Sequence, residues 1–180
     1  MIRITIVCFS LWLSATVVVA AATAKAAKNP YSLIQYDSVV IYDMEKPPPE
    51  TESVIDKSGT LVSGITKRAT LSAHTAKKLS ILLGQRSSFG KQTAACFEPH
   101  LGVVYYYKGK VEASITICVD CNRLESSRDL PAQKQKREGS KEEGYYYMGD
   151  GMSKRFRKFL NSLLKANNFS HQIPYDSAFD

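Results

Sequence analysis

The sequence lacks the short motifs that mark the commonest enzyme classes. It has no glycine-rich phosphate loop, no nucleophile elbow, no pair of histidines at metalloprotease spacing and no calcium-binding loop. Histidine and cysteine are scarce, with three and four residues in a chain of 180. These absences argue against nucleotide hydrolysis and zinc-dependent proteolysis, and they confine candidate chemistry to the one stretch where cysteine and histidine occur together.

Long apolar runs are also missing, except at the N-terminus. Arg3 precedes an apolar run over residues 4–22, and Ala22-Thr23-Ala24 has the small-x-small pattern of a cleavage site. We therefore expect a signal peptide over residues 1–24, and an uncleaved N-terminal anchor is the alternative because the run approaches spanning length. In either case we expect the rest of the chain in the periplasm, outside the cell or at the cell surface.

Positive charge exceeds negative charge. The net charge is +7, and removing residues 1–24 removes only Arg3, which leaves 7 − 1 = +6. Such a balance can attract anionic lipid or acidic polysaccharide, whereas an exported protein is not expected to meet nucleic acid. We expect a weak anionic contact through Lys154, Arg155, Arg157 and Lys158, and the alternative is a solvated face that keeps the domain soluble.

Apolar periodicity predicts two helices. Ser72 is placed to cap a helix over residues 73–83, and Ser153 to cap a second helix over residues 154–166. Runs rich in Val, Ile and Tyr predict strands, which are residues 38–44, 53–55, 61–65, 101–107, 111–118 and 145–147.

These elements predict an α+β fold, with a small antiparallel sheet of about four to six strands packed with the two helices. We expect one domain over residues 27–169. Residues 128–143 are polar and mixed in charge, which predicts a solvated, partly disordered excursion. The tail over residues 170–180 is expected to be irregular.

All three cysteines outside the N-terminal segment lie between residues 96 and 121. Cys96 and His100 are separated by three residues, and Cys118 and Cys121 by two, with a hairpin between the two pairs. If residues 108–110 form a three-residue turn, His100 lies opposite Cys118 and on the same face of the hairpin. A two-residue turn would shift this register by one residue. The four side chains are therefore expected to meet at the open end of the hairpin.

Three sulfurs and one imidazole are a common ligand set for structural zinc, and soft sulfur ligands would also suit copper. We therefore consider Cys96, His100, Cys118 and Cys121 as a metal site. A disulfide that leaves one thiol over is the alternative in an oxidising compartment. A thiol-disulfide oxidoreductase using Cys118 and Cys121 is a third hypothesis. It is disfavoured because such a pair normally opens a longer helix than the one to two turns expected after Cys121.

The segments CFEPH (residues 96–100), GVVYY (102–106) and ICVDC (117–121) resemble an uncharacterised family of exported Bacteroidota proteins. That family has a Cys-aromatic-x-Pro knuckle, a hairpin and a Cys-x2-Cys end. The resemblance implies export from a bacterial cell and implies no activity. We therefore expect a non-enzymatic envelope protein whose Cys/His cluster holds a structural metal. The alternatives are the oxidoreductase and a surface-binding module for anionic lipid or polysaccharide.

Overall fold

The computed structural model describes residues 28–45, 53–94, 97–140 and 144–173. The expected signal peptide, Cys96 and residues 174–180 of the expected tail lie outside the described residues. The described helices are α1 (Ala73–Leu83) and α2 (Lys154–Ala166), with short 3-10 helices η1 (Pro30–Ser32), η2 (Arg86–Ser88) and η3 (Pro131–Gln133). The strands are β1 (Ser38–Met44), β2 (Ile65–Thr70), β3 (Phe89–Lys91), β4 (Leu101–Tyr107), β5 (Lys110–Cys118), β6 (Arg123–Ser126), β7 (Lys136–Ser140), β8 (Gly144–Met148) and β9 (Gly151–Met152).

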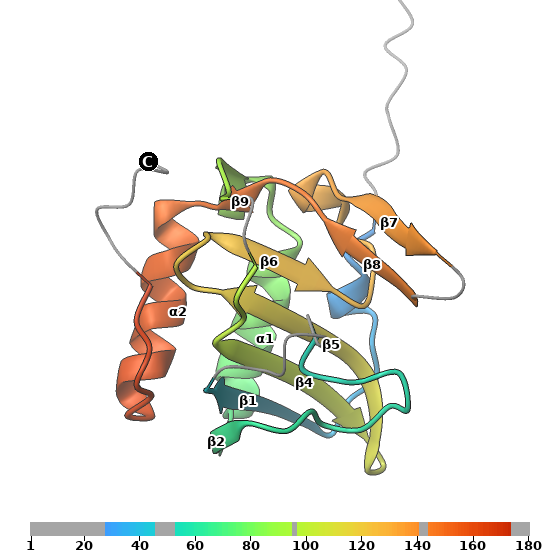
Figure 1. Cartoon of the computed structure of the whole chain (residues 1–180), viewed down its shortest axis with the longest axis vertical. Helices are drawn as coiled ribbons and strands as arrows, with labels where there is room; N and C mark the ends of the chain where they lie inside the picture. The colour runs from blue at the N-terminus through green and yellow to red at the C-terminus, as the bar shows by residue number, and fades with distance from the viewer. Residues whose placement is uncertain (1–27, 46–52, 95–96, 141–143, 174–180) are drawn as a thin grey trace, which may run out of the picture.

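Seven of these strands form one antiparallel sheet in the order β2-β1-β4-β5-β6-β8-β7 (Figure 1). Strands β3 and β9 pair separately. The α+β class and both helices are confirmed, with helix bounds as the sequence predicts. The main sheet is larger than the four to six strands that the sequence analysis expected.

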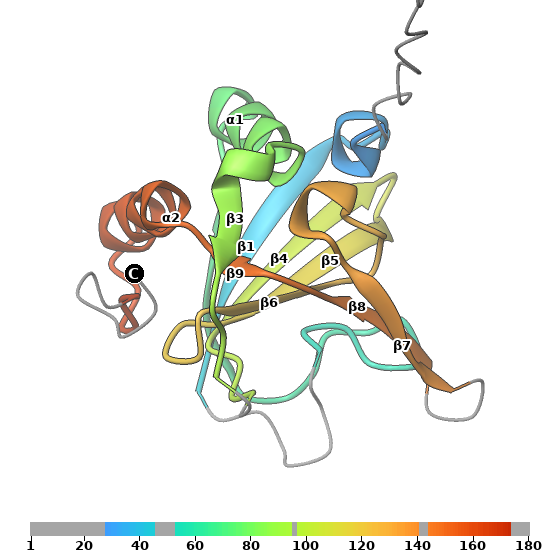
Figure 2. The same cartoon turned by 90° about the horizontal axis from the view of Figure 1, so that it is seen from above.

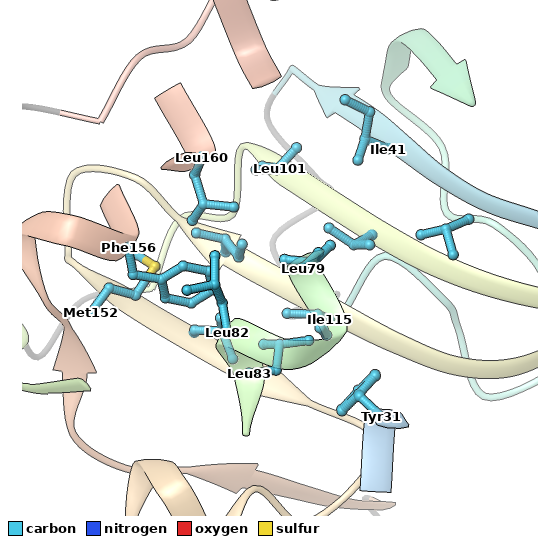
Figure 3. Packing of buried hydrophobic residues seen from close by; sticks show 14 of the residues in the cluster. Tyr31, Ile41, Leu79, Leu82, Leu83, Leu101, Ile115, Met152, Phe156 and Leu160 are labelled. Atoms are coloured by element: carbon cyan, nitrogen blue, oxygen red, sulfur yellow. The ribbon is translucent and has the colours of Figure 1, made fainter. Parts of the chain in front are cut away.

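Both helices lie on one side of the sheet, as Figure 2 shows. The main core lies between them and the sheet, where apolar residues of α1 and α2 meet Leu101 and Ile115 of the central strands (Figure 3). The helices begin where the sequence predicts because Ser72 accepts a hydrogen bond from the Thr75 amide and Ser153 accepts one from the Phe156 amide. Residues 53–64 cover the opposite face of the sheet, over a second apolar cluster.

The central hairpin has the predicted register for an unexpected reason. Its turn contains two residues, Lys108 and Gly109, both at positive φ (50° and 74°), rather than three. That turn alone would shift every pair by one residue. A bulge at Glu112 shifts the register back, so that Tyr105 lies opposite Ala113 as predicted. Between the turn and the bulge the faces are exchanged. Val111, which strict alternation with Ala113 would place on the main core face, packs with the second cluster.

The polar stretch over residues 128–143 is more regular than the sequence analysis expected. Of its described residues, η3 and β7 form ordered structure, and β7 pairs with β8 as a hairpin at the sheet edge. Gln133 is buried, and its side-chain amide donates to the carbonyl oxygens of Leu124 (3.0 Å) and Asp150 (3.0 Å). The polar composition of this stretch therefore reflects an edge hairpin and a buried glutamine whose NH2 group donates twice.

Two other strand predictions are wrong in part. The predicted strands over residues 53–55 and 61–65 make only a single bridge, between Ile55 and Leu61. The regular strand begins at Ile65 and continues through Thr70 as β2, the edge strand next to β1. Three consecutive exposed polar residues in this strand hide the alternation that would have predicted it.

Gly102 lies where the covering segment meets the sheet. A Cβ at this position would approach the Val54 side chain to 2.2 Å. The amide of Val54 also donates to Thr116 Oγ1 across the same contact (2.9 Å). The covering segment therefore packs directly on the backbone of β4, which is possible only at a residue without a side chain.

We expect Gly102→Ala to lower the free energy of unfolding by about 1–3 kcal/mol, because the added methyl group overpacks the contact with Val54. Urea denaturation measures the change. Val54→Ala in the same chain should recover part of the loss, with a coupling of about 0.5–3 kcal/mol in the double-mutant cycle. Strict additivity of the two changes would contradict this account of the contact.

Candidate functional site

One end of the main sheet gathers most of the side chains that can do chemistry. Asp43 lies near the end of β1, His100 just before β4, Cys118 at the end of β5 and Arg123 at the start of β6. Neighbouring strands are antiparallel, so these positions lie at the same end of the strands. The segment that follows α2 brings His171 to the same end.

Cys118 and Cys121 form a disulfide bond, with their Cα atoms 5.3 Å apart. Cys118 is the last residue of β5, and Cys121 lies in the short connection to β6, where Asn122 completes the turn at φ 52°. The residues are 0% and 1% exposed. The amide of Cys121 also donates to Cys118 Sγ (3.2 Å). Both sulfur atoms are therefore bonded and shielded from solvent.

Asn122 connects this turn to the rest of the molecule. Its side-chain amide donates to the carbonyl oxygens of Gln92 (3.0 Å) and Met152 (3.1 Å). Arg157 Nη1 donates to the same Met152 oxygen (3.1 Å). The approach is close: a Cβ on Gly151 would lie 2.5 Å from the Gln92 oxygen. The disulfide turn thereby holds β9 and the beginning of α2 against the sheet.

Three of the four residues considered as a metal site are described, and these three, His100, Cys118 and Cys121, are not arranged to hold a metal ion in this state. Cys96 lies outside the described residues, and the sulfurs of Cys118 and Cys121 are bonded to each other, whereas zinc requires thiolates. His100 departs from the predicted register, since its amide donates to the oxygen of Ile117 (3.0 Å), the residue that already pairs with Leu101. Its ring stacks on His171, with centroids 4.2 Å apart. Over the described ranges, no three His, Cys, Asp or Glu residues are grouped to hold a metal ion.

The geometry also differs from that of a catalytic cysteine pair. The short helix expected after Cys121 is instead strand β6. No helix N-terminus therefore follows Cys121 to lower a thiol pKa. On this strand Arg123 pairs with Glu125 (2.7 Å), and its guanidinium lies 4.9 Å from the centroid of the Phe97 ring. The residues after the disulfide extend the sheet and carry a shielded ion pair.

Asp43 anchors the segment that follows α2. Its Oδ2 accepts hydrogen bonds from the amide (3.0 Å) and the hydroxyl (2.8 Å) of Ser170. Its Oδ1 lies 3.1 Å from Nδ1 of His171. Burial would raise the pKa of Asp43, but the hydrogen bonds from Ser170 and His171 outweigh it and hold that pKa below its ordinary value. The charged carboxylate of Asp43 thus holds the segment that follows α2 against β1.

Asp43, His171 and Ser170 have the residue types of a hydrolase triad but not its geometry. In a triad the histidine contacts the carboxylate through one ring nitrogen and the serine through the other. Here Ser170 Oγ (3.2 Å) and Asp43 both approach Nδ1 of His171, and Ser170 also bonds directly to the carboxylate. The ring cannot relay a proton between them, so the cluster is a docking contact.

This cluster was not predicted from the sequence. The local signal was an acidic residue within the apolar run SVVIYDM, which indicates a buried carboxylate with a partner. The identity of the partner could not be predicted, because His171 is separated from Asp43 by 128 positions and lies outside any regular element.

The basic residues of α2 divide into two groups. Lys154, Arg155 and Lys158 are exposed, as expected. Arg157, which the sequence analysis placed with them on the solvated face, is fully buried, and this prediction is wrong. Arg157 precedes Leu160 and Leu164 by three and seven residues, so helical spacing places it on the core side of α2.

No protein family, curated protein or solved structure that was compared matches this chain. The resemblance to exported Bacteroidota proteins therefore remains an expectation. Neither helix in the described part of the chain is long and apolar enough to cross a bilayer. Fold and site together define an α+β protein. At one end of its central strands lie a buried disulfide and the docked segment that follows α2.

The histidine pair predicts a dependence of stability on pH. Burial lowers the pKa of His100 and the neighbouring His171 lowers it further, against the opposing influence of Asp120, Glu98 and Asp43. The unfolded chain therefore takes up this proton at higher pH than the folded chain does. We expect the free energy of unfolding to fall as the pH drops below about 6.5, measured by urea titrations at several pH values.

His100→Gln removes the titrating ring and should flatten this dependence. His74→Gln is the matched control, because His74 is exposed on α1. An unchanged slope in His100→Gln, or an equal change in both variants, would contradict the assignment of the effect to the stacked pair.

Proposed function

We propose that this chain is an exported, non-enzymatic envelope protein in which the Cys118–Cys121 pair is a structural disulfide. The observation that carries the proposal is the burial of both bonded sulfurs in a strand-to-strand turn. A disulfide of this kind persists in oxidising compartments and is rare in the cytosol. The apolar run and small-x-small pattern of residues 1–24 support the same compartment.

A non-enzymatic role is supported by the candidate reactive groups themselves. The disulfide is shielded, and the serine, histidine and aspartate at this end of the sheet are bonded as a docking contact. A groove of about 490 Å³ lies between residues 55–61 and the tip of the β4–β5 hairpin. The titratable side chains lining this groove are Tyr106 and Lys110, and these residues provide no acid–base pair.

The proposal predicts how the cysteine pair responds to reduction. The closed loop is short, so the bond should contribute about 2 kcal/mol to the free energy of unfolding. We expect the unfolding midpoint in urea to fall by a corresponding amount in Cys118→Ala/Cys121→Ala. Wild-type protein that was reduced after denaturation is the matched control, because it loses the bond and keeps both sulfur atoms.

Exchange chemistry separates this function from the oxidoreductase. The native protein should neither accelerate insulin reduction nor exchange with a small dithiol until denaturant is added, because the sulfurs are shielded. Insulin reduction that is lost in Cys118→Ser would overturn the structural role and favour the oxidoreductase.

Export has its own test. The full chain expressed in a bacterial host should be recovered from the periplasmic or envelope fraction, with a new N-terminus near Ala24 and the Cys118–Cys121 bond present in peptide mass analysis. A chain that begins at Lys25 after an added Met is the control and should stay in the cytosol. Retention of the full chain in the cytosol would refute the proposed location.

A further inference from the structure

We propose that the outer face of α2 binds an acidic polysaccharide. The basic surface comprises Arg155, Lys158 and Lys165 on α2, together with Lys67 of β2 and Lys78 of α1. The choice of partner rests on the proposed export, since polymers of acidic sugars are ligands that an envelope protein would meet. The binding surface itself follows from charge, burial and contacts.

Two segments of the chain contain basic residues and no acidic residue. Residues 57–97 contain seven Lys or Arg and no Asp or Glu. Residues 151–175 contain five Lys or Arg and again no acidic residue. These two segments supply β2, α1 and α2, so none of these three elements contains an acidic residue.

Contacts join cations from the three elements. Lys67 Nζ donates to the carbonyl oxygen of Asn168 just after the C-terminus of α2 (2.9 Å). Lys78 Nζ lies 5.2 Å from the centroid of the Phe159 ring, halfway along α2. Helix α2 is thus bordered by a lysine from β2 near its end and by a lysine from α1 along its length.

Asp43 of β1, which lies opposite Lys67 of β2, is already bonded to other groups. Asp43 is 3% exposed and accepts hydrogen bonds from Ser170, while its other oxygen contacts His171. Both carboxylate oxygens of Asp43 therefore contact the segment that follows α2. The side chains of Arg155, Lys158 and Lys165 are exposed on α2, so their charges face solvent.

The apolar residues of α2 favour a soluble polymer over a membrane. Phe156, Leu160 and Leu164 are buried in the main core, and Phe159 is partly buried against it. A helix that lies in a bilayer must instead direct its apolar face outward. Over the described ranges, the exposed large apolar residues are Leu33, Leu61 and Ile81, of which only Ile81 lies on a helix.

The dimensions of α2 suit a chain with repeated negative charges. Arg155 and Lys165 are separated by about 15 Å along the helix axis at 1.5 Å per residue. Long lysine and arginine side chains keep their charges in water and can follow a flexible ligand. Several carboxylates of one polymer can therefore bind together, and the attraction should weaken as salt screens it.

The test uses the processed, oxidised protein and polygalacturonate as the probe, with binding followed by calorimetry at low and at physiological ionic strength. Arg155→Gln/Lys158→Gln/Lys165→Gln should weaken binding by about tenfold or more at low salt, since three contacts are lost. Lys28→Gln/Lys110→Gln/Lys136→Gln is the matched control, with the same change in net charge at exposed sites away from α2, and should change affinity by less than about twofold.

Each outcome decides the proposal. An equal loss of affinity in the two triple variants would show that binding depends on net charge alone, and would overturn the assigned surface. Binding to vesicles of phosphatidylcholine and phosphatidylglycerol, with none to polygalacturonate, would assign the surface to membranes instead. Lys158→Arg/Lys165→Arg should retain binding, which distinguishes lost charge from a damaged helix.

Failure of this inference is separable from failure of the proposed function. The binding measurement is made on purified protein, so it does not depend on where the cell places the chain. An exported protein that ignores polygalacturonate refutes the polysaccharide surface alone, whereas a chain retained in the cytosol refutes the proposed location alone.

Discussion

The structure depends on the closed turn between β5 and β6. The Cys118–Cys121 bond fixes the turn, and Asn122 then reaches the carbonyl oxygens of Gln92 and Met152 on two other segments. Met152 also receives a hydrogen bond from buried Arg157. A guanidinium inside a protein is costly unless its donors are satisfied. The turn therefore helps to provide the environment in which α2 can place a charged residue against the core.

The helices could be predicted from the sequence because their signals are local. Serine caps and apolar residues at helical spacing specify α1 and α2 without knowledge of the rest of the chain. The sheet could be predicted where strands are rich in apolar or aromatic residues, as in β1, β4, β5 and β8. Strands β2 and β6 are short and carry exposed or ion-paired residues, and their positions are set by neighbours distant in sequence. No local pattern identifies such strands.

The candidate site was predicted in part. Its location at the open end of the hairpin follows from strand alternation, but the ladder ends at Leu101 and Ile117, and His100 donates to Ile117 instead of pairing with Cys118. Whether Cys118 and Cys121 would bond to each other or bind a metal depends on atomic approach, which spacing does not determine. The contact between Asp43 and His171 joins two ends of the domain, and only the folded chain brings them together.

The bulge at Glu112 has a consequence for how this hairpin can vary. A two-residue turn with a bulge and a three-residue turn without one place Tyr105 and Ala113 on the same face. An extra residue in the turn can therefore be offset by loss of the bulge residue, and the face of the hairpin that packs against the helices stays the same. Such exchanges would alter Tyr106 and Val111, which line the groove beside residues 55–61. The tip of the hairpin is thus free to diversify independently of the core.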